Sequence, residues 1–367
     1  KAAMIALEDM KPASKLPTPE PTSVVSAAAS SEVSAVAAGR AASKPPTDVP
    51  STECQVLFQP LSPELRFLPE GPYSLPNGNI IWVGIQHGSD STVGSLNIFN
   101  SASGTNESFD LPGRPGFAFP TTKSNVFVCG VERSLGLFNA NDGSWTELLS
   151  DIDSGVDNTI INDGVVFDDN IIFGCKELEF KTQKAGLYLW RGRDRRLFQL
   201  RNDQICSNGK AVIKNPDRTL TLIDIDSPSK TITKCWLEVA VGTVGKPEVI
   251  VDLTSEDVFP DGMIVTPDGK SLIVALYDPG DPPHGTARQY SIATGELEAT
   301  WTCPGSPRVT CPQLVKINGR IQLLLTTAVE HMDAEQQARH PNAGSLFIGN
   351  AVLGTVGEQP LFPVSDQ

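Results

Sequence analysis

No stretch of the sequence approaches the roughly 18 uninterrupted apolar residues that a membrane-spanning helix needs, so we expect no membrane span. Histidine is scarce, and the four histidines, at positions 87, 284, 331 and 340, include no pair at the i, i+4 spacing of a zinc-binding helix. No Cys-x-x-Cys pair occurs either. A zinc site built from histidine and cysteine is therefore not expected.

The cysteine spacing also argues against a disulfide framework. The seven cysteines lie at positions 54, 129, 175, 206, 235, 303 and 311, an odd number without a regular spacing. This pattern predicts reduced, mostly buried thiols in a protein that is not secreted. A bridge between Cys303 and Cys311 is the alternative that the spacing leaves open.

Positive charge is in deficit. The chain has 29 Lys and Arg residues against 43 Asp and Glu residues, which gives a formal net charge of −14 and a pI of about 4.8. Such a surface repels the phosphates of nucleic acids and of anionic membranes, so neither is predicted as a partner. It tolerates or attracts cations.

The first fifty residues lack what a folded core requires. Residues 11 to 50 contain no aromatic residue and are rich in Ala, Ser, Pro, Thr and Val, so they cannot offset their ordering entropy. We predict a low-complexity tail over residues 1–51, disordered or extended, which is also a candidate docking segment for a protein partner. The chain begins at Lys1 rather than at a methionine, which favours an organelle-targeted precursor. The predicted location is the cytoplasm or an organelle interior, a plastid-like one included.

From Cys54 onward, short β-rich runs alternate with turn signals, and only the region from Asp333 to Arg339 reads as a short helical turn. Asn-Gly and Asp-Gly pairs punctuate the runs as expected turns. These pairs are Asn77-Gly78, Asp142-Gly143, Asp163-Gly164, Asn208-Gly209, Asp261-Gly262, Asp268-Gly269 and Asn318-Gly319.

A repeated hairpin selects the architecture. A Gly-x-Leu-x-aromatic strand followed by a turn recurs at intervals of roughly 40 to 50 residues, the length of one four-stranded propeller blade. Its copies end at Phe99, Phe138, Trp190, Tyr290 and Phe347, and one copy is missing between Trp190 and Tyr290. We therefore predict an all-β fold, a six-bladed β-propeller over residues 52–367.

Four motifs place an oxygen ligand beside a glycine: Pro69-Glu70-Gly71-Pro72, Asn162-Asp163-Gly164, Ser207-Asn208-Gly209 and Pro260-Asp261-Gly262. Because the inner strands of a propeller converge on its axis, equivalent blade positions can meet around one point. Two carboxylates and two amides suit a hard cation such as Ca²⁺, Mg²⁺ or Mn²⁺. Taken singly, each Asn-Gly or Asp-Gly pair is more often an ordinary turn without a ligand role.

The order of these four motifs resembles the senescence marker protein, gluconolactonase and luciferin-regenerating enzyme family, which includes regucalcin. The resemblance extends through Pro260-Asp-Gly-Met263, through Asp268-Gly-Lys270 and through residues 331–344, and it covers roughly residues 52 to 363. It implies the six-bladed fold and a small-molecule substrate. It also implies a hydrolase of a lactone or related small cyclic ester, in which a water activated by a divalent metal attacks the carbonyl carbon.

Carried over residue by residue, the resemblance implies that Glu70, Asn208 and Asp261 hold one divalent cation. The expected cation is Ca²⁺, and the alternatives are Mg²⁺, Mn²⁺ and Zn²⁺. Asn162 is expected beside the cation, in contact with the substrate or with bound water, and Asp261 is also the candidate general base. Asp261 and Asn162 are thus the candidate catalytic residues.

Two further positions join Asn162 as candidate substrate-binding residues. Sugar lactonases of the family carry an arginine two residues before the asparagine, and Ile160 stands there in this chain. Isoleucine cannot hydrogen-bond sugar hydroxyls, so this departure favours a more apolar ester or lactone. Arg114, in an Arg-Pro pair typical of the second blade, is expected at the channel edge.

The rival hypothesis is a non-catalytic propeller that serves as a metal-binding or scaffold subunit of a larger assembly. A third is a related chemistry on the same fold, such as phosphotriester hydrolysis or a metal-assisted isomerisation, because fold alone does not decide among activities. An open channel mouth above Asn162 and Asp261 would favour an enzyme. A mouth plugged by the tail or by the long Thr231–Glu256 insertion would favour a scaffold.

Overall fold

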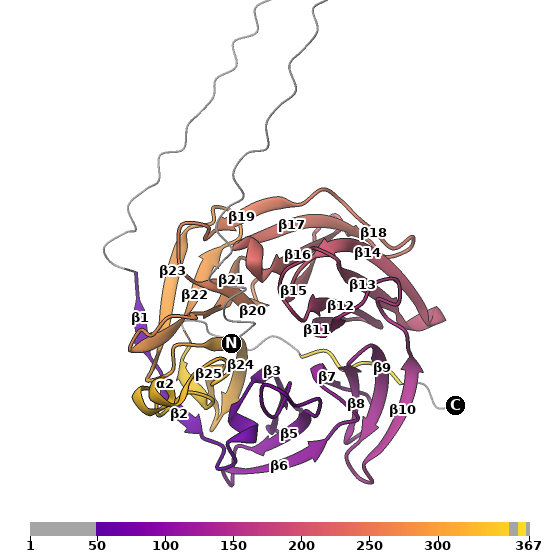
Figure 1. Cartoon of the computed structure of the whole chain (residues 1–367). Helices are drawn as coiled ribbons and strands as arrows, with labels where there is room; N and C mark the ends of the chain where they lie inside the picture. The colour runs from indigo at the N-terminus through magenta and orange to yellow at the C-terminus, as the bar shows by residue number, and fades with distance from the viewer. Residues whose placement is uncertain (1–48, 352–358, 365–367) are drawn as a thin grey trace, which may run out of the picture.

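The computed structural model describes residues 49–351 and 359–364. These residues form six β-sheets arranged radially around one axis (Figure 1). The predicted six-bladed β-propeller is confirmed. Almost all of the predicted tail, residues 1–48, lies outside the described residues.

We number the blades in chain order and list their strands from the axis outward. Blade 1 contains β3 (Pro69–Ser74), β4 (Ile80–Gly84), β5 (Ser95–Asn100) and β6 (Thr105–Asp110). Blade 2 contains β7 (Pro115–Pro120), β8 (Val126–Val131), β9 (Ser134–Asn139) and β10 (Ser144–Leu149). Blade 3 contains β11 (Thr159–Phe167), β12 (Asn170–Glu177), β13 (Ala185–Arg191) and β14 (Arg196–Gln204).

Blade 4 contains β15 (Ser207–Lys214), β16 (Leu220–Asp226), β17 (Thr231–Glu238), β18 (Thr243–Val244) and β19 (Glu248–Asp252). Blade 5 contains β20 (Phe259–Val265), β21 (Ser271–Tyr277), β22 (His284–Ser291), β23 (Leu297–Pro304) and β1 (Ser51–Glu53). Blade 6 contains β24 (Val309–Ile317), β25 (Arg320–Thr327), β26 (Leu346–Asn350) and β2 (Gln55–Phe58).

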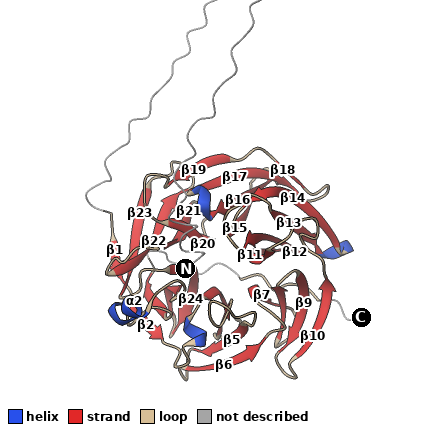
Figure 2. Ribbon diagram, in the orientation of Figure 1, coloured by secondary structure: helices blue, strands red, loops and turns tan. Residues whose placement is uncertain are grey.

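Helices are short and lie in the connections (Figure 2). They are α2 (Ala334–Arg339) and the 3-10 helices η1 (Glu64–Arg66), η2 (Gly192–Asp194) and η3 (Ser227–Ser229). Helix α2 confirms the predicted helical turn, and its N-cap Asp333 forms a capping box with Gln336. Within the described part of the chain, no helix is long and apolar enough to cross a membrane.

The first described strands close the ring of blades. β2 pairs antiparallel with β26 as the outermost strand of blade 6, and β1 adds in parallel to β23 of blade 5. Blade 6 is thus built from an N-terminal strand and the last three strands of the fold, so unfolding of β2 would expose the edge of β26. All seven cysteines, Cys303 and Cys311 included, are free, as the odd cysteine count predicted.

The repeated Gly-x-Leu-x-aromatic run of the sequence forms the third strand of a blade. Its five copies fall on β5, β9, β13, β22 and β26. The missing copy corresponds to β17, which opens the segment 231–256. This segment forms the outer part of blade 4, where β18 and β19 both pair with β17.

Four of the seven predicted Asn-Gly and Asp-Gly turns are confirmed, at Gly78, Gly143, Gly269 and Gly319. Each of these glycines has a positive φ, between 71° and 84°, which L-residues with a side chain rarely adopt. The other three pairs, Asp163-Gly164, Asn208-Gly209 and Asp261-Gly262, are not turns, and that prediction was wrong. They lie inside β11, β15 and β20, the innermost strands of their blades.

Three glycines of the innermost strands, Gly209, Gly262 and Gly116, are required because the backbone of the next blade approaches closely. A Cβ atom on Gly209 would lie 2.7 Å from the carbonyl oxygen of Asp261 on the next blade, and one on Gly262 would lie 2.7 Å from the carbonyl oxygen of Thr310. At Gly116 of β7, the corresponding distance to the carbonyl oxygen of Asn162 is 2.5 Å. Backbone oxygens cannot move aside as a flexible side chain can, so only glycine fits.

We therefore expect Gly116→Ala to destabilise the propeller by about 1–3 kcal/mol or more, because the added methyl group overpacks two neighbouring inner strands. Urea denaturation followed by circular dichroism measures the effect. Gly155→Ala is the matched control, since a Cβ there meets nothing within 4 Å. Equal stability of the two variants would contradict this account of the inner strands.

Candidate active site

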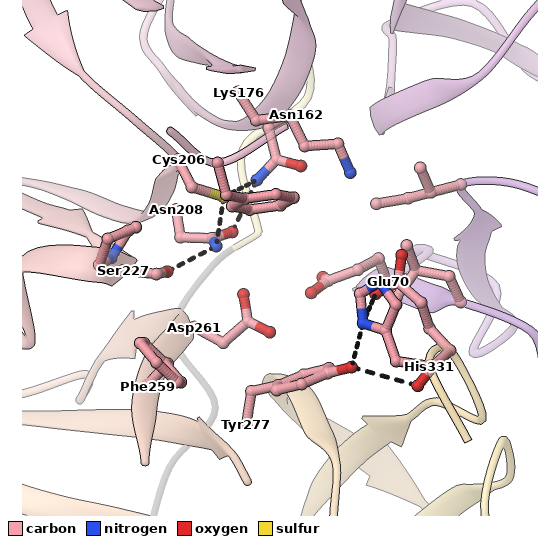
Figure 3. Close-up of a pocket in the computed structure, with 15 residues that line it drawn as sticks. Glu70, Asn162, Lys176, Cys206, Asn208, Ser227, Phe259, Asp261, Tyr277 and His331 are labelled. Carbon is pink, nitrogen blue, oxygen red and sulfur yellow. Dashed lines mark hydrogen bonds and ion pairs between the residues drawn. The ribbon is translucent and has the colours of Figure 1, made fainter. Parts of the chain in front are cut away.

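A cavity of about 70 Å³ lies at one mouth of the central channel, with room for several water molecules (Figure 3). Glu70, Asn162, Asn208 and Asp261 all line it. They come from β3, β11, β15 and β20, the innermost strands of four different blades. The fold therefore brings together the four polar residues that the sequence motifs singled out.

A register shift in each inner strand accompanies this placement. Pairing slips between Ile161 and Asp163, between Asn208 and Lys210, and between Pro260 and Met263. The same irregularity follows Glu70 in β3. A bulge adds an unpaired residue and re-aims side chains, which is how Asn162 faces this cavity while the adjacent Asp163 lines the opposite mouth of the channel.

The two asparagines are fixed by a chain of hydrogen bonds. Asn162 Nδ2 donates to the carbonyl oxygen of Ser207 and to Asn208 Oδ1, both at 2.9 Å. Asn208 Nδ2 donates to Ser227 Oγ at 2.8 Å, and that hydroxyl donates to the carbonyl oxygen of Pro260 at 2.7 Å. Both amides therefore have their nitrogen atoms occupied. The Asn162 oxygen points into the cavity (Figure 3), and the Asn208 oxygen accepts the hydrogen bond from Asn162 and keeps one lone pair.

The two carboxylates lie in an unfavourable environment. Burial, together with the negative charge of Asp163, raises the pKa of Glu70 to about 8, although one oxygen accepts a 2.7 Å hydrogen bond from Gly71 N. Burial and the negative charge of Glu70 raise the pKa of Asp261 well above its usual range. No hydrogen-bond donor contacts the Asp261 carboxylate among the described residues.

The oxygen atoms that face the cavity fit a hard divalent cation. The Asp261 carboxylate is unpartnered, one oxygen of Glu70 is free of the Gly71 contact, and the Asn208 oxygen keeps one lone pair. Oxygen ligands of this mixture are those that Ca²⁺ and Mg²⁺ take. Within the described ranges no three His, Cys, Asp or Glu side chains gather into a cluster, so a cation here would need the amide oxygen.

The remaining sequence candidates lie elsewhere. Arg114 binds the Glu132 carboxylate through two hydrogen bonds of 2.7 and 2.8 Å and is not among the described residues that line the cavity. Ile160 is 3% exposed and does not line the cavity either. A substrate-binding role for these two residues stays a prediction.

Sequence reasoning missed several residues of the cavity wall. Lys176, at the end of β12, is a buried cation that lines it. On the opposite side, the Tyr277 hydroxyl lies 3.2 Å from His331 Nδ1, and Glu330 Oε2 lies 3.8 Å from the same nitrogen. These residues belong to no recognisable short motif. From the sequence alone, they could have been found only by predicting which residues pair with the strands that carry the four motifs.

Apolar side chains also line the cavity. They belong to Leu68, Ile85, Phe180 and Phe259. Phe180 has a φ of 55°, an uncommon conformation for a residue with a side chain. Neither β18 nor β19 contributes a lining residue, so the segment 231–256 does not plug the mouth.

Comparison with known proteins agrees with this geometry. The model of the SMP-30/Gluconolactonase/LRE-like region matches residues 68–329, which include Glu70, Asn162, Asn208 and Asp261. YvrE of Bacillus subtilis (strain 168), named as a sugar lactone lactonase, is 29% identical over 192 residues, or 51% of this chain and 60% of that protein. Regucalcin of Gallus gallus is 29% identical over 132 residues, or 35% of this chain and 40% of that protein. The chain thus matches less than two thirds of the length of either relative.

The crystal structure of a regucalcin from Agrobacterium tumefaciens strain C58, described as a calcium-binding protein, has a TM-score of 0.71 against this chain. The alignment covers 86% of this chain and 99% of that one at 21% identity. At this identity the likeness shows the shared propeller fold.

The raised pKa of Glu70 predicts how stability depends on pH without a cation. A folded-state pKa of about 8, against a usual value of 4.5, means that the folded chain keeps a proton that the unfolded chain releases. The stability of the cation-free protein should therefore fall as pH rises from about 4.5 toward 8. Glu70→Gln should be more stable relative to wild type at pH 8 than at pH 4.5, measured by urea denaturation with a chelator.

Glu107→Gln is the control for this prediction, because Glu107 is an exposed carboxylate on β6. It should show no such pH-dependent gain. If Glu70→Gln changed the stability equally at both pH values, Glu70 would not carry the proton.

Proposed function

Since the chain belongs to the SMP-30/gluconolactonase/LRE-like family, we propose that it is a divalent-metal-dependent hydrolase of a lactone or related small cyclic ester. The family relation supports a lactonase-type hydrolase. The observation that carries the proposal is the convergence of Glu70, Asn162, Asn208 and Asp261 on one cavity.

Glu70, Asn208 and Asp261 would hold the cation, with Ca²⁺ preferred. A divalent cation bound there would polarise the ester carbonyl and stabilise negative charge on its oxygen. Burial raises the pKa of both carboxyl groups, and negative charge adds to it, from Asp163 on Glu70 and from Glu70 on Asp261. A divalent cation would offset this concentration of negative charge, which favours its binding.

Asn162 would orient the reactants. Its nitrogen is held by Ser207 and Asn208, so its oxygen is available to accept a hydrogen bond from a water molecule or a substrate hydroxyl. Holding a water against the carbonyl carbon in this way lowers the entropic barrier to attack.

Asp261 would serve as the general base. Its carboxylate faces the cavity and has no donor of its own to suppress its basicity. In the proposed reaction the water oxygen bonds to the carbonyl carbon and the ring C–O bond breaks. The water proton passes to Asp261 and then to the leaving alkoxide, so the product is the open-chain hydroxy acid.

The walls favour an apolar substrate body. Leu68, Ile85, Phe180 and Phe259 offer no hydrogen bonds through their side chains, and Ile160 replaces the arginine that sugar lactonases of the family carry. We therefore propose a lactone or ester with fewer hydroxyl groups than an aldonolactone. The location in a cytoplasmic or organelle interior and the docking role of the tail stay predictions.

Turnover and metal binding test the proposal together. We expect Asp261→Asn to lower kcat/KM for aliphatic lactones by about 10²- to 10⁴-fold, the usual contribution of a general base, and to weaken Ca²⁺ binding in calorimetry. Asp268→Asn is the matched control, because it changes an Asp-Gly pair in the turn after the same strand and lies outside the cavity.

Ca²⁺ binding by the wild type without turnover of any sugar or aliphatic lactone would support the rival scaffold reading. Absence of Ca²⁺, Mg²⁺, Mn²⁺ and Zn²⁺ binding would remove the cation site and leave the fold.

A further inference from the structure

One charged group at the site has no role in the function proposed above. Lys176 is 7% exposed and lines the cavity, and no hydrogen bond or ion pair of its ammonium group occurs among the described residues. Its side chain extends over the cavity, opposite Asp261 and Glu70 (Figure 3). An ammonium group has three donors, and burying it without partners is unfavourable.

Lys176 lies within electrostatic reach of both carboxylates. Its positive charge opposes the rise in the pKa of Glu70 and of Asp261. When they are ionised and hold no cation, these two carboxylates are counter-ions of the Lys176 ammonium group. A divalent cation held by the same carboxylates would neutralise them and leave Lys176 without that compensation.

The other carboxylates near this end of the channel, Glu132 and Glu330, form no ion pair with Lys176 among the described residues. Glu132, whose pKa Lys176 also lowers, is bound by Arg114 at 2.7 and 2.8 Å. Glu330 lines the cavity beside His331, with 3.8 Å between its Oε2 and the His331 Nδ1 atom. With a cation bound, the Lys176 ammonium would be the free positive group facing the substrate.

Lys176 lies opposite the position at which this chain departs from the sugar lactonases of the family. Lys176 on β12 is the cross-strand partner of Ile160 on β11. Directly opposed residues of an antiparallel pair project from the same face, with Cβ atoms about 5 Å apart. The chain thus has an apolar residue at the arginine position and a cation on the neighbouring strand.

A backbone bridge between Lys176 and Cys206 fixes this cation relative to the metal-ligand candidates. Cys206 lies two residues before Asn208, at the start of blade 4. Phe180, three residues beyond the end of β12, also lines the cavity. The same segment of blade 3 therefore supplies both a cation and an aromatic side chain to the cavity.

We propose that Lys176 selects a substrate with one anionic group, a carboxylate, attached to an otherwise apolar lactone or ester. This inference rests on the proposed function, because it assigns the substrate class of the same site. Lysine can bind such a ligand as a compact point charge with three hydrogen-bond donors.

The test compares two lactones that differ in one charge, 5-oxotetrahydrofuran-2-carboxylate and 5-oxotetrahydrofuran-2-carboxamide, with Ca²⁺-loaded protein. We expect the wild type to prefer the carboxylate in kcat/KM. Lys176→Met should lower this preference by about tenfold or more, the usual effect of a hydrogen bond to a charged group. Lys176→Arg should retain most of it.

Two binding measurements separate this inference from the hydrolase proposal. Tetrahydrofuran-2-carboxylate, which has no ester bond, should bind the Ca²⁺-loaded wild type more tightly than Lys176→Met in calorimetry. Lys176→Met should bind Ca²⁺ at least as tightly as the wild type, because it removes a repulsive charge, and this also shows that the variant is folded.

The outcomes are distinct. Lys176-dependent binding of the carboxylate without turnover of either lactone would support the anion site and overturn the hydrolase. Turnover of both lactones with equal effects of Lys176→Met would support the hydrolase and overturn the anion site. Equal binding of the carboxylate by wild type and Lys176→Met would place the anion on the Ca²⁺ ion and also overturn it.

Discussion

The close approach of the innermost strands at the propeller axis is the constraint on which both the fold and the site depend. Gly209 and Gly262 face backbone oxygens of the next blade at distances that exclude a Cβ atom. The register shifts beside them turn Asn208 and Asp261 toward the channel. The glycine and the polar residue before it are therefore one structural unit, because the bulge that turns the side chain inward lies where the backbone of the next blade makes contact.

This convergence concentrates negative charge where water is scarce. Burial raises the pKa of both Glu70 and Asp261, and neighbouring negative charge adds to the effect, from Asp163 on Glu70 and from Glu70 on Asp261. The neutral chain of hydrogen bonds from Asn162 through Asn208 and Ser227 to Pro260 spans blades 3 to 5 and holds the amides in place without adding charge. The site thus combines neutral amides fixed by hydrogen bonds with buried carboxylates whose negative charge a bound cation would offset.

Local sequence patterns predicted the fold well because propeller blades repeat. The third-strand hairpins, four of the seven Asn-Gly and Asp-Gly turns, and α2 with its Asp333 cap could be placed from neighbouring residues alone. The other Asp-Gly and Asn-Gly pairs were misread as turns because a dipeptide does not reveal whether its glycine is needed for a positive φ or for contact with another blade. That distinction depends on residues about 45 or more positions away, such as Asp261 opposite Gly209 and Thr310 opposite Gly262.

Lys176 is a second feature that the local sequence could not predict, and it concerns the candidate site rather than the fold. Nothing in the sequence around it marks a site, and its significance comes from pairing opposite Ile160 and from bridging to Cys206 on the next blade. A hairpin offers two side chains to the same face of a sheet, so a cation can move from one strand to its partner while the four oxygen donors stay unchanged. The donors that would bind a metal and the residue that would read the substrate are then separable within one blade. If Lys176 binds the substrate as proposed, one cross-strand exchange would change the specificity and leave the four oxygen-bearing side chains of the inner strands in place.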